Sequence, residues 1–193
     1  MSLLVRIKQK ITLWFYDPRS DADNTLNWLV ARYDGPFCHC EVQFSDRSAY
    51  AVYAHSCVTR TERNFSNPAY SSQVLWLSPE AERAARAAAE AALGTPFSLL
   101  GMINCHTRLL RSAGQGVFCS ELCVRVLQAA GLLGGVHAAH VSPSGLHRRL
   151  ERDFSGGARH AEERGSDTVG DRGTASLALD WNRKAGPTPR AVM

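Results

Sequence analysis

The chain has 193 residues, of which 45% are hydrophobic and 21% are charged, and its formal net charge is +4. This balance is typical of one folded domain with an apolar core, and it excludes a uniformly disordered chain, a collagen-like chain and a small disulfide-stapled scaffold. A net charge of +4 is too small by itself to indicate a nucleic-acid partner.

The first sixteen residues and the cysteines indicate the compartment. Arg6, Lys8 and Lys10 interrupt the run of about 7–15 apolar residues that a signal peptide needs. No stretch of the sequence approaches the ~20 apolar residues of a transmembrane helix. Six cysteines occur, at positions 38, 40, 57, 105, 119 and 123. We therefore expect a cytoplasmic protein without a transmembrane segment, whose cysteines are reduced thiols or metal ligands.

The first half of the chain predicts strands and one helix. Residues 5–16 show the alternation of a strand, and the apolar spacing from Ser20 onward predicts a helix that ends at a turn over residues 34–36. Residues 37–44 and 49–55 flank a polar turn, so they predict a β-hairpin. Residues 74–77 predict one further short strand.

The second half predicts helices. Ser78 as N-cap and Pro79 at the first helical position predict a helix that runs to about residue 93. Residues 95–104 predict a short helix or turn, residues 119–130 the most apolar helix, and residues 144–154 a final short helix. Residues 155–193 are rich in Gly, Ser, Asp and Arg, so this tail is expected to be disordered and is a candidate for binding a partner. The domain boundaries are therefore 1–154 and 155–193.

Cys119 is the first candidate for chemistry, because it begins the most apolar helix directly after a glycine-bearing loop. The free backbone N–H groups and the dipole at a helix start lower the pKa of a thiol there and can also stabilise an oxyanion. Cys123 lies one turn later and is expected to pack as a small apolar residue. The competing interpretation is that Cys119 is also a buried, inert thiol.

His39 is the second candidate, and it lies on a predicted strand. Strand alternation places His39 on the same face as Glu41 and Gln43, with residues 38, 40, 42 and 44 on the other face. A histidine beside a glutamate suits a general base with an orienting partner. His55 ends the next strand and would lie beside His39 across the hairpin, so it is the second candidate for orienting the base. The competing interpretation for a lone strand histidine is an ordinary surface or core residue.

A histidine on a strand and a cysteine at a helix start together form the pattern of a thiol hydrolase. The segments PFCHCEVQF, FCSELCVRVLQAAGL and VSPSGLHRRL resemble the circularly permuted branch of the NlpC-type papain-like fold. That branch includes lecithin:retinol acyltransferase-like enzymes and bacterial and viral members, and in it the histidine strand precedes the cysteine helix, as here. TPFSLLGMIN also resembles the segment before the cysteine helix, and the resemblance covers residues 13–154.

The resemblance implies an α+β, papain-like domain whose antiparallel sheet packs on the cysteine-bearing helix. It implies a thiol hydrolase (a peptidase or amidase) or an acyltransferase that acts on an amide or ester through a thioester intermediate. Cys119 would be the nucleophile and His39 the base, while the third residue is either Glu41 or His55. The substrate would be a peptide, amide or lipid, with no cofactor and no metal. A viral or bacterial origin fits this branch, with the host cell as the compartment of a viral member.

Three other functions compete with this hypothesis. A catalytically silent interaction module of the same fold is the main alternative. A structural zinc site could use Cys38, Cys40, His55 and Cys57, although their spacing is unusual for zinc. Cys105 and His106 add two possible ligands, but without a recognisable zinc-site spacing. Nucleic-acid binding could use Arg148, Arg149 and Arg152, but such a cluster is usually a solvated helix face, and no aromatic stacking platform supports it.

Overall fold

The structure is a computed structural model, and it describes residues 8–20, 31, 32, 34–107 and 115–154. Within this part the chain is mixed α+β, with one five-stranded antiparallel sheet and four α-helices. The α+β class predicted from the sequence is therefore confirmed. In the described part, no helix has both the length and the apolar character needed to cross a membrane.

The sheet has the strand order β4-β3-β2-β1-β5, and all of its pairings are antiparallel. Its strands are β1 (Gln9–Tyr16), β2 (His39–Gln43), β3 (Ser48–Ala51), β4 (Thr59–Glu62) and β5 (Tyr70–Leu77). The short strand β2 is therefore the central strand, flanked on one side by β1 and on the other by β3. All residues of β2 pair with β1, and Val42 and Gln43 pair with β3 as well.

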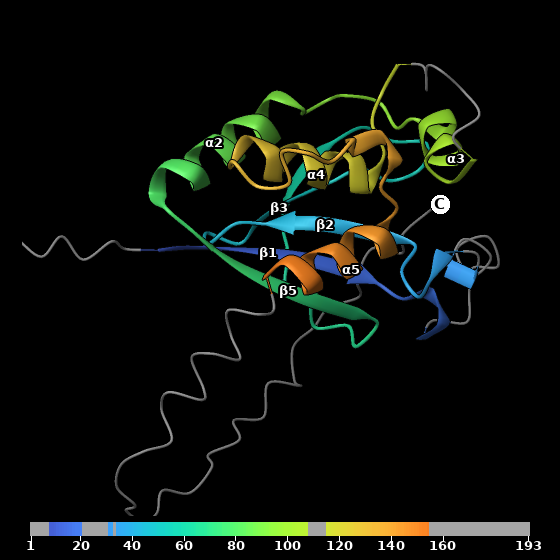
Figure 1. Cartoon of the computed structure of the whole chain (residues 1–193), viewed down its shortest axis with the longest axis horizontal. Coiled ribbons are helices and arrows are strands. Elements are labelled where there is room, and N and C mark those ends of the chain that lie inside the picture. Colours follow the sequence, from blue (N-terminus) through green and yellow to red (C-terminus); the bar gives the residue numbers. More distant parts are fainter. Residues whose placement is uncertain (1–7, 21–30, 33, 108–114, 155–193) are drawn as a thin grey trace, which may run out of the picture.

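Three helices cover one face of this sheet (Figure 1). The helices of the described chain are α2 (Pro79–Ala91), α3 (Leu99–Thr107), α4 (Cys119–Ala129) and α5 (Pro143–Phe154), with 3₁₀ turns η1 (Pro18–Ser20) and η2 (Ala138–His140). Helices α2, α4 and α5 contribute buried residues to one core with the sheet, whereas α3 lies beside the start of α4. Helix α2 begins as predicted, because the Ser78 side chain accepts the backbone N–H of Ala81 and Pro79 follows the cap.

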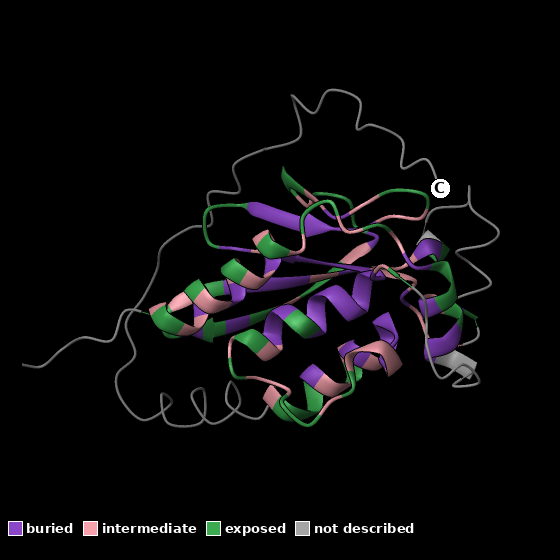
Figure 2. Ribbon diagram, turned by 90° about the horizontal axis from the view of Figure 1, so that it is seen from above, coloured by how far each residue is buried: buried purple, intermediate pink, exposed green. Residues whose placement is uncertain are grey.

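The hydrophobic core lies between the sheet and α4. Alternate residues of β1, namely Ile11, Leu13 and Phe15, are fully buried against the helices. Helix α4 is buried along most of its length, as Figure 2 shows, and Leu122 and Leu127 are among its core side chains. The central helix is therefore held rigidly over the central strand, and its first residue is Cys119.

The opposite face of the sheet is covered by the connection into β5. Trp14 of β1 stacks on Phe65, with ring centroids 4.5 Å apart and planes within 11°. Trp14 also donates a hydrogen bond of 2.9 Å from Nε1 to Oε1 of Gln43. The register pairs Trp14 with Glu41 and Tyr16 with His39, so these side chains share that face. Side chains of β2 are consequently buried on both sides of the sheet.

Several predicted boundaries differ from the structure. The strand predicted over 49–55 ends at Ala51, and β5 begins at Tyr70 rather than at residue 74. Strand β4 was not predicted, because its sequence TRTE is an edge strand with no apolar residue to show an alternation. The predicted helix over residues 20–33 lies almost wholly outside the described residues, but its end is visible where the Gly35 N–H donates to the Ala31 carbonyl at 3.1 Å. Residues 155–193 also lie outside them.

Candidate active site

His39 and Cys119 each begin a secondary-structure element, and the two elements pack together. His39 is the first residue of β2 and Cys119 is the first residue of α4, and both starts lie at the same end of the molecule (Figure 1). The two side chains interact, since each shifts the pKa of the other. The start of α4 is anchored to the segment between η2 and α5, because the Ser120 hydroxyl donates a 2.6 Å hydrogen bond to the Val141 carbonyl. The structure thus brings together the two residues that the sequence singled out.

Cys119 is an activated thiol. Its pKa lies well below the ordinary value, chiefly because it accepts a hydrogen bond from the Cys40 side chain and also because of its hydrogen bond and charge interaction with His39. These effects outweigh burial, which raises the pKa of the thiol. No side-chain cap occupies the helix start, since Phe118 at the N-cap makes no capping hydrogen bond. Its backbone N–H groups therefore remain aligned to favour an anion.

His39 carries the complementary shift. Burial on its own would lower the pKa of the imidazole, but hydrogen bonding to Cys119 and interaction with Glu41 raise it to about 10. A lowered thiol pKa beside a raised imidazole pKa favours transfer of the thiol proton to His39, which is the direction that activates a cysteine nucleophile.

Glu41 is the third member of the cluster, and it is completely buried. Its Oε1 atom lies 3.5 Å from Nε2 of His39. The same oxygen accepts hydrogen bonds from Tyr53 Oη at 2.7 Å, Arg63 Nη1 at 2.5 Å and Tyr70 Oη at 3.3 Å. Burial raises the pKa of Glu41, but His39, Arg63 and Tyr53 together lower it below its ordinary value. Glu41 is therefore an ionised carboxylate held in one orientation beside the imidazole.

Two buried polar atoms of the site have no hydrogen-bond partner within the described residues: Nε2 of His39 and Oε2 of Glu41. The 3.5 Å contact between these two residues is consequently an ion pair rather than a hydrogen bond. Buried polar groups without partners are rare and concentrate at sites of strain or catalysis. Long contacts of this kind are common in catalytic sites without substrate, and they shorten when the substrate is bound.

The structure places Tyr53, not His55, beside His39. Strands β2 and β3 pair Val42 with Tyr50, and the same antiparallel register carried three residues further sets His39 opposite Tyr53. The two rings stack with centroids 4.7 Å apart and planes within 24°. His55 is exposed on a turn where its φ is 61°, so the chain has already left the sheet. Of the two candidates for orienting the base, Glu41 is the one in contact with His39.

Arg63, Tyr53 and Tyr70 belong to the site but were not identified from the sequence. Arg63 directly follows the unpredicted strand β4, so no pattern placed it near Glu41. Its guanidinium also lies 5.0 Å from the centroid of the Phe65 ring and 5.8 Å from that of Tyr70, which are cation–π distances. The sequence shows tyrosines and arginines around the predicted hairpin, but it does not reveal which of them face Glu41, because that depends on how the strands pair.

The remaining cysteines differ from Cys119. All six are free thiols. Burial, together with the charge of Cys119, raises the pKa of Cys38 and that of Cys105 to about 12. Burial and hydrogen bonds to Cys119 and Cys123 also raise the pKa of Cys40 well above its ordinary value. The pKa of Cys119 is thus shifted in the opposite direction to that of Cys38, Cys40 and Cys105.

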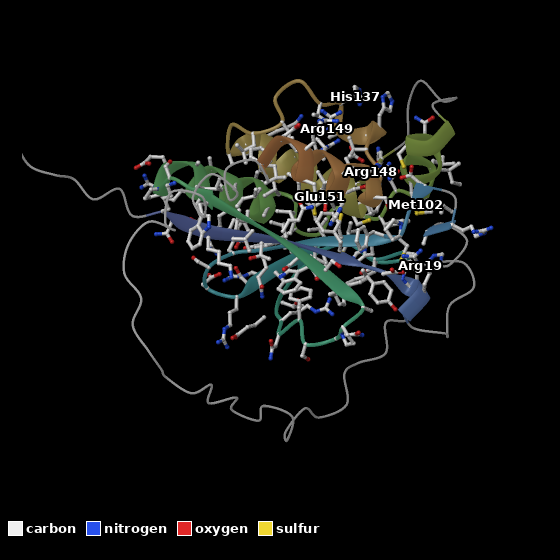
Figure 3. The ribbon with its side chains drawn as sticks, turned by 60° about the horizontal axis from the view of Figure 1, so that its bottom comes forward. Arg19, Met102, His137, Arg148, Arg149 and Glu151 are labelled. Atoms are coloured by element: carbon white, nitrogen blue, oxygen red, sulfur yellow. The ribbon has the colours of Figure 1, made fainter. Side chains whose placement is uncertain are left out.

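The described side chains give little support to a zinc site or to nucleic-acid binding. Across the described ranges, no group of three or more His, Cys, Asp or Glu side chains could hold a metal ion. Figure 3 shows Arg148 and Arg149 along α5. Arg148 is tied to Asp34, donating a 2.9 Å hydrogen bond to its carbonyl, and Arg152 pairs with Asp153 at 2.9 Å. This arrangement is that of a solvated helix face with local ion pairs.

No family model matches the chain, and no curated protein and no solved structure is detectably similar to it. Function must therefore be inferred from the chemistry of the site itself. That chemistry comprises a cysteine with a lowered pKa at a helix start, a histidine with a raised pKa that interacts with it, and a buried carboxylate that faces the histidine.

Proposed function

We propose that the chain is a cysteine-dependent hydrolase or acyltransferase that acts on an amide or ester through a thioester intermediate. The observation that carries this proposal is the placement of Cys119 at the start of α4 beside His39, whose Nε2 lies 3.5 Å from Oε1 of Glu41. In agreement with it, the interaction between Cys119 and His39 lowers the pKa of the thiol and raises that of the imidazole. Opposite shifts in neighbouring groups are typical of assigned nucleophile and acid–base roles.

The reaction follows from the roles of these groups. The Cys119 thiolate attacks the carbonyl carbon, and the backbone N–H of Cys119 at the helix start stabilises the oxyanion that forms. The His39 imidazolium then gives its proton to the leaving amine or alcohol as the C–N or C–O bond breaks, which leaves a thioester on Cys119. Neutral His39 next takes a proton from water or from another acceptor, which attacks the thioester and releases the thiolate. Glu41 holds the imidazole and stabilises its charged form throughout.

The chain order supports a specific version of this proposal. The histidine strand precedes the cysteine helix, and the five-stranded antiparallel sheet packs on that helix. This order and packing are those expected for a circularly permuted papain-like fold of the NlpC type, as found in bacterial and viral proteins. Within that fold Glu41 takes the third catalytic position, because it faces His39 at 3.5 Å.

Acylation of the protein by simple esters tests the proposal. Wild-type protein incubated with p-nitrophenyl esters of short and long acids should form a thioester on Cys119, detected as an added acyl mass by mass spectrometry. The Cys119→Ala variant should form none. Cys123→Ala is the matched control, since it removes a thiol one turn along the same helix and should leave acylation unchanged.

Either of two results would overturn the proposal. The first is equal acylation of wild type and Cys119→Ala, which would assign the label to another residue. The second is a fully folded wild-type protein that takes no acyl group from any ester, which would favour a catalytically silent interaction module.

A further inference from the structure

One short segment, residues 141–145, contacts both halves of the candidate site. It follows η2 and includes the first turn of α5, at the same end of the molecule as the starts of β2 and α4 (Figure 1). Its two serines are buried, with exposed fractions of 7% for Ser142 and 1% for Ser144. Buried hydroxyl groups are almost always hydrogen-bonded, so the partners of these serines show what the segment holds.

Ser144 is bonded to the chain just before β2. Its hydroxyl accepts the backbone N–H of Phe37 at 2.9 Å and donates to the carbonyl of the same residue at 3.1 Å. Phe37 is buried and stands two residues before His39, the first residue of β2. One hydroxyl thus satisfies both backbone groups of Phe37, and it fixes the main chain that leads into His39.

Two further features hold the same stretch of chain against α5. The Ser142 hydroxyl donates to Oδ2 of Asp34, and Arg148 donates a 2.9 Å hydrogen bond to the Asp34 carbonyl. Gly35 has a φ of 131°, and a Cβ atom on it would lie 2.9 Å from Cβ of Ser144. Glycine is the residue that avoids both the backbone strain and the clash. The chain before β2 therefore lies directly on the start of α5.

The 141–145 segment is also bonded to α4. Ser120 directly follows Cys119 and is fully buried, and its hydroxyl donates the 2.6 Å hydrogen bond to the Val141 carbonyl. The backbone of the residue after the nucleophile is therefore tied to the same segment as the backbone that leads into the base.

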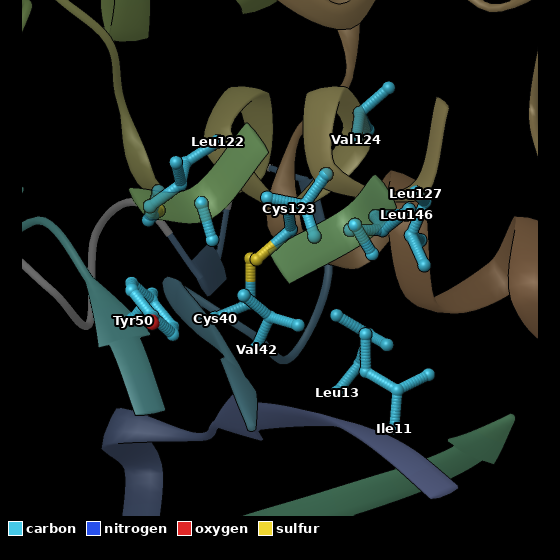
Figure 4. Close-up of a cluster of buried hydrophobic side chains, with 14 of the residues drawn as sticks. Ile11, Leu13, Cys40, Val42, Tyr50, Leu122, Cys123, Val124, Leu127 and Leu146 are labelled. Carbon is cyan, nitrogen blue, oxygen red and sulfur yellow. The ribbon is translucent and has the colours of Figure 1, made fainter. Parts of the chain in front are cut away.

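The segment is itself held in place. The Ser142 hydroxyl accepts the N–H of Gly145 at 3.0 Å and so caps α5, while the Ser142 carbonyl accepts the N–H of Leu146 at 2.8 Å. Leu146 is fully buried in the core that α4 shares with the sheet, as Figure 4 shows. A close-packed core leaves such a residue little room to move. The segment can therefore hold its two neighbours in a fixed relation.

We propose that the 141–145 segment fixes the position of His39 relative to Cys119, with Ser120 and Ser144 as positioning residues. The inference rests on the proposed function for the identity of the reacting pair. Each serine acts through the backbone beside one reacting residue, Ser120 beside Cys119 and Ser144 near His39.

The pairing of β2 shows why His39 needs this support. Strand β1 pairs with β2 along its whole length, whereas β3 pairs with Val42 and Gln43, at the end away from His39. Within the described sheet, the residue that carries the base is therefore paired on one side, with β1. A displacement of about 1 Å between reacting groups costs about 100-fold in rate, so a second constraint on the start of β2 matters for the chemistry.

Two variants remove the constraint at one end each. Ser144→Ala loses both hydrogen bonds to Phe37, and Ser120→Ala loses the bond to Val141. In each variant the rate at which p-nitrophenyl acetate acylates Cys119 should fall roughly tenfold or more. The pH midpoint of Cys119 alkylation by iodoacetamide should rise toward about 8.5, the pKa of an ordinary thiol. Mass spectrometry measures both quantities.

The double variant distinguishes one shared constraint from two independent contacts. If both serines hold the same relative position, release of one end already frees the reacting pair. Ser120→Ala combined with Ser144→Ala should then acylate no more than about threefold more slowly than the slower single variant. A loss equal to the product of the two single losses would contradict the shared constraint.

Ser48→Ala is the matched control. Ser48 is also a buried serine, and its hydroxyl makes two hydrogen bonds, to Asp46 at 2.6 Å and from Arg86 at 3.0 Å. It begins β3, next to the turn that follows β2, and so lies at the end of β2 away from His39. This variant should lower the unfolding temperature, as Ser144→Ala does, but should leave the alkylation profile of Cys119 unchanged.

Circular dichroism verifies that each variant is folded. If Ser144→Ala does not fold, Ser120→Ala carries the test alone, because alanine is the residue best suited to a helix. Folded serine variants that are less stable but alkylate Cys119 with the wild-type pH dependence would overturn the inference, since the serines would then serve the fold alone. An equal shift of the profile in Ser48→Ala would overturn it as well.

These failures are distinct from failure of the proposed function. A shifted alkylation profile in the two serine variants, with no acylation of wild type by any ester, refutes the enzyme but not the positioning role. An acylated wild-type protein whose alkylation profile survives both substitutions refutes only the positioning role.

Discussion

The two faces of the five-residue strand β2 bury different kinds of side chain, apolar on one face and ionisable on the other. On one face Cys40 and Val42 pack into the apolar core below α4. On the other face His39 and Glu41 are covered by tyrosine rings and a guanidinium. Both faces are withdrawn from solvent, since Cys40 is 1% exposed and Glu41 is fully buried. Depth of burial alone therefore cannot explain what these residues do.

The difference lies in the partners on each face. Burial raises the pKa of Cys40 and nothing on the apolar face reverses this effect. Burial also acts to raise the pKa of Glu41, but the cations His39 and Arg63 and the Tyr53 hydroxyl reverse it. Cys119, the first residue of α4, is influenced by side chains from both faces of β2. Cys40 on one face and His39 on the other both lower the pKa of the Cys119 thiol. These partners thus lower the pKa of a buried thiol that burial alone would raise.

Neutralising Glu41 should give the largest effect. Glu41→Gln leaves the Arg63 guanidinium without its buried anion and removes the carboxylate that favours protonated His39. We expect a loss of about 3 kcal/mol in the free energy of unfolding, toward the lower end for a broken buried pair because Arg63 is 29% exposed. The pKa of Cys119 should rise in parallel. Urea denaturation and alkylation rates measure the two effects, and a variant unchanged in both contradicts the role of Glu41.

The contribution of Glu41 should also depend on pH. The pKa of Glu41 is lowered in the folded protein. The carboxylate therefore stabilises the fold above the pKa of about 4.3 that it has in the unfolded chain, and this stabilisation is lost as pH falls toward the folded value. The difference in unfolding free energy between wild type and Glu41→Gln should be full at pH 7 and shrink below pH 4. A difference that grows on acidification would contradict the assignment of an ionised Glu41.

A core substitution on the apolar face sharpens the comparison. Leu122→Ala on α4 should cost about 3 kcal/mol of unfolding free energy, because it removes a fully packed side chain and leaves a cavity. The low pKa of Cys119 should survive, since neither Cys40 nor His39 is altered. Equilibrium unfolding and alkylation against pH separate the two outcomes. An equal loss of thiolate character in this variant would mean that packing, not the polar partners, sets the pKa.

Tyr53 allows the two contacts of one side chain to be separated. Tyr53→Phe keeps the ring stacked on His39 but removes the 2.7 Å hydrogen bond to Glu41. We expect a loss of about 1 kcal/mol in stability and a modest rise in the pKa of Glu41. Tyr53→Leu removes the stacking as well and should slow Cys119 alkylation further. If the two variants behave identically, the stacked ring does not position His39.

His55 should give the smallest effect. It is exposed and lies on a turn with a positive φ of 61°, which asparagine tolerates better than most residues. His55→Asn should change the unfolding free energy by less than about 0.5 kcal/mol and leave the Cys119 alkylation rate unaltered. A marked fall in that rate would return His55 to the candidates for orienting the base.

Helices were more predictable from the sequence than the environment of the site. Ser78 and Pro79 marked the start of α2, and an apolar run marked α4, because caps and helical periodicity are local signals. Cys119 and His39 stood out for the same reason. Tyr53 and Arg63 did not, since their roles depend on strand register and on an exposed edge strand that carries no apolar pattern. These are properties of tertiary structure.

The most direct measurement is the alkylation rate of each cysteine against pH, followed by mass spectrometry on native wild-type and His39→Ala protein. In wild type, Cys119 should react fastest and remain reactive well below pH 8.5, the region where an ordinary thiol loses its thiolate. In His39→Ala that advantage should be lost as the pKa of Cys119 rises. A Cys119 that is inert, or that titrates identically in both proteins, would contradict the thiolate–imidazolium pair on which the proposed function depends.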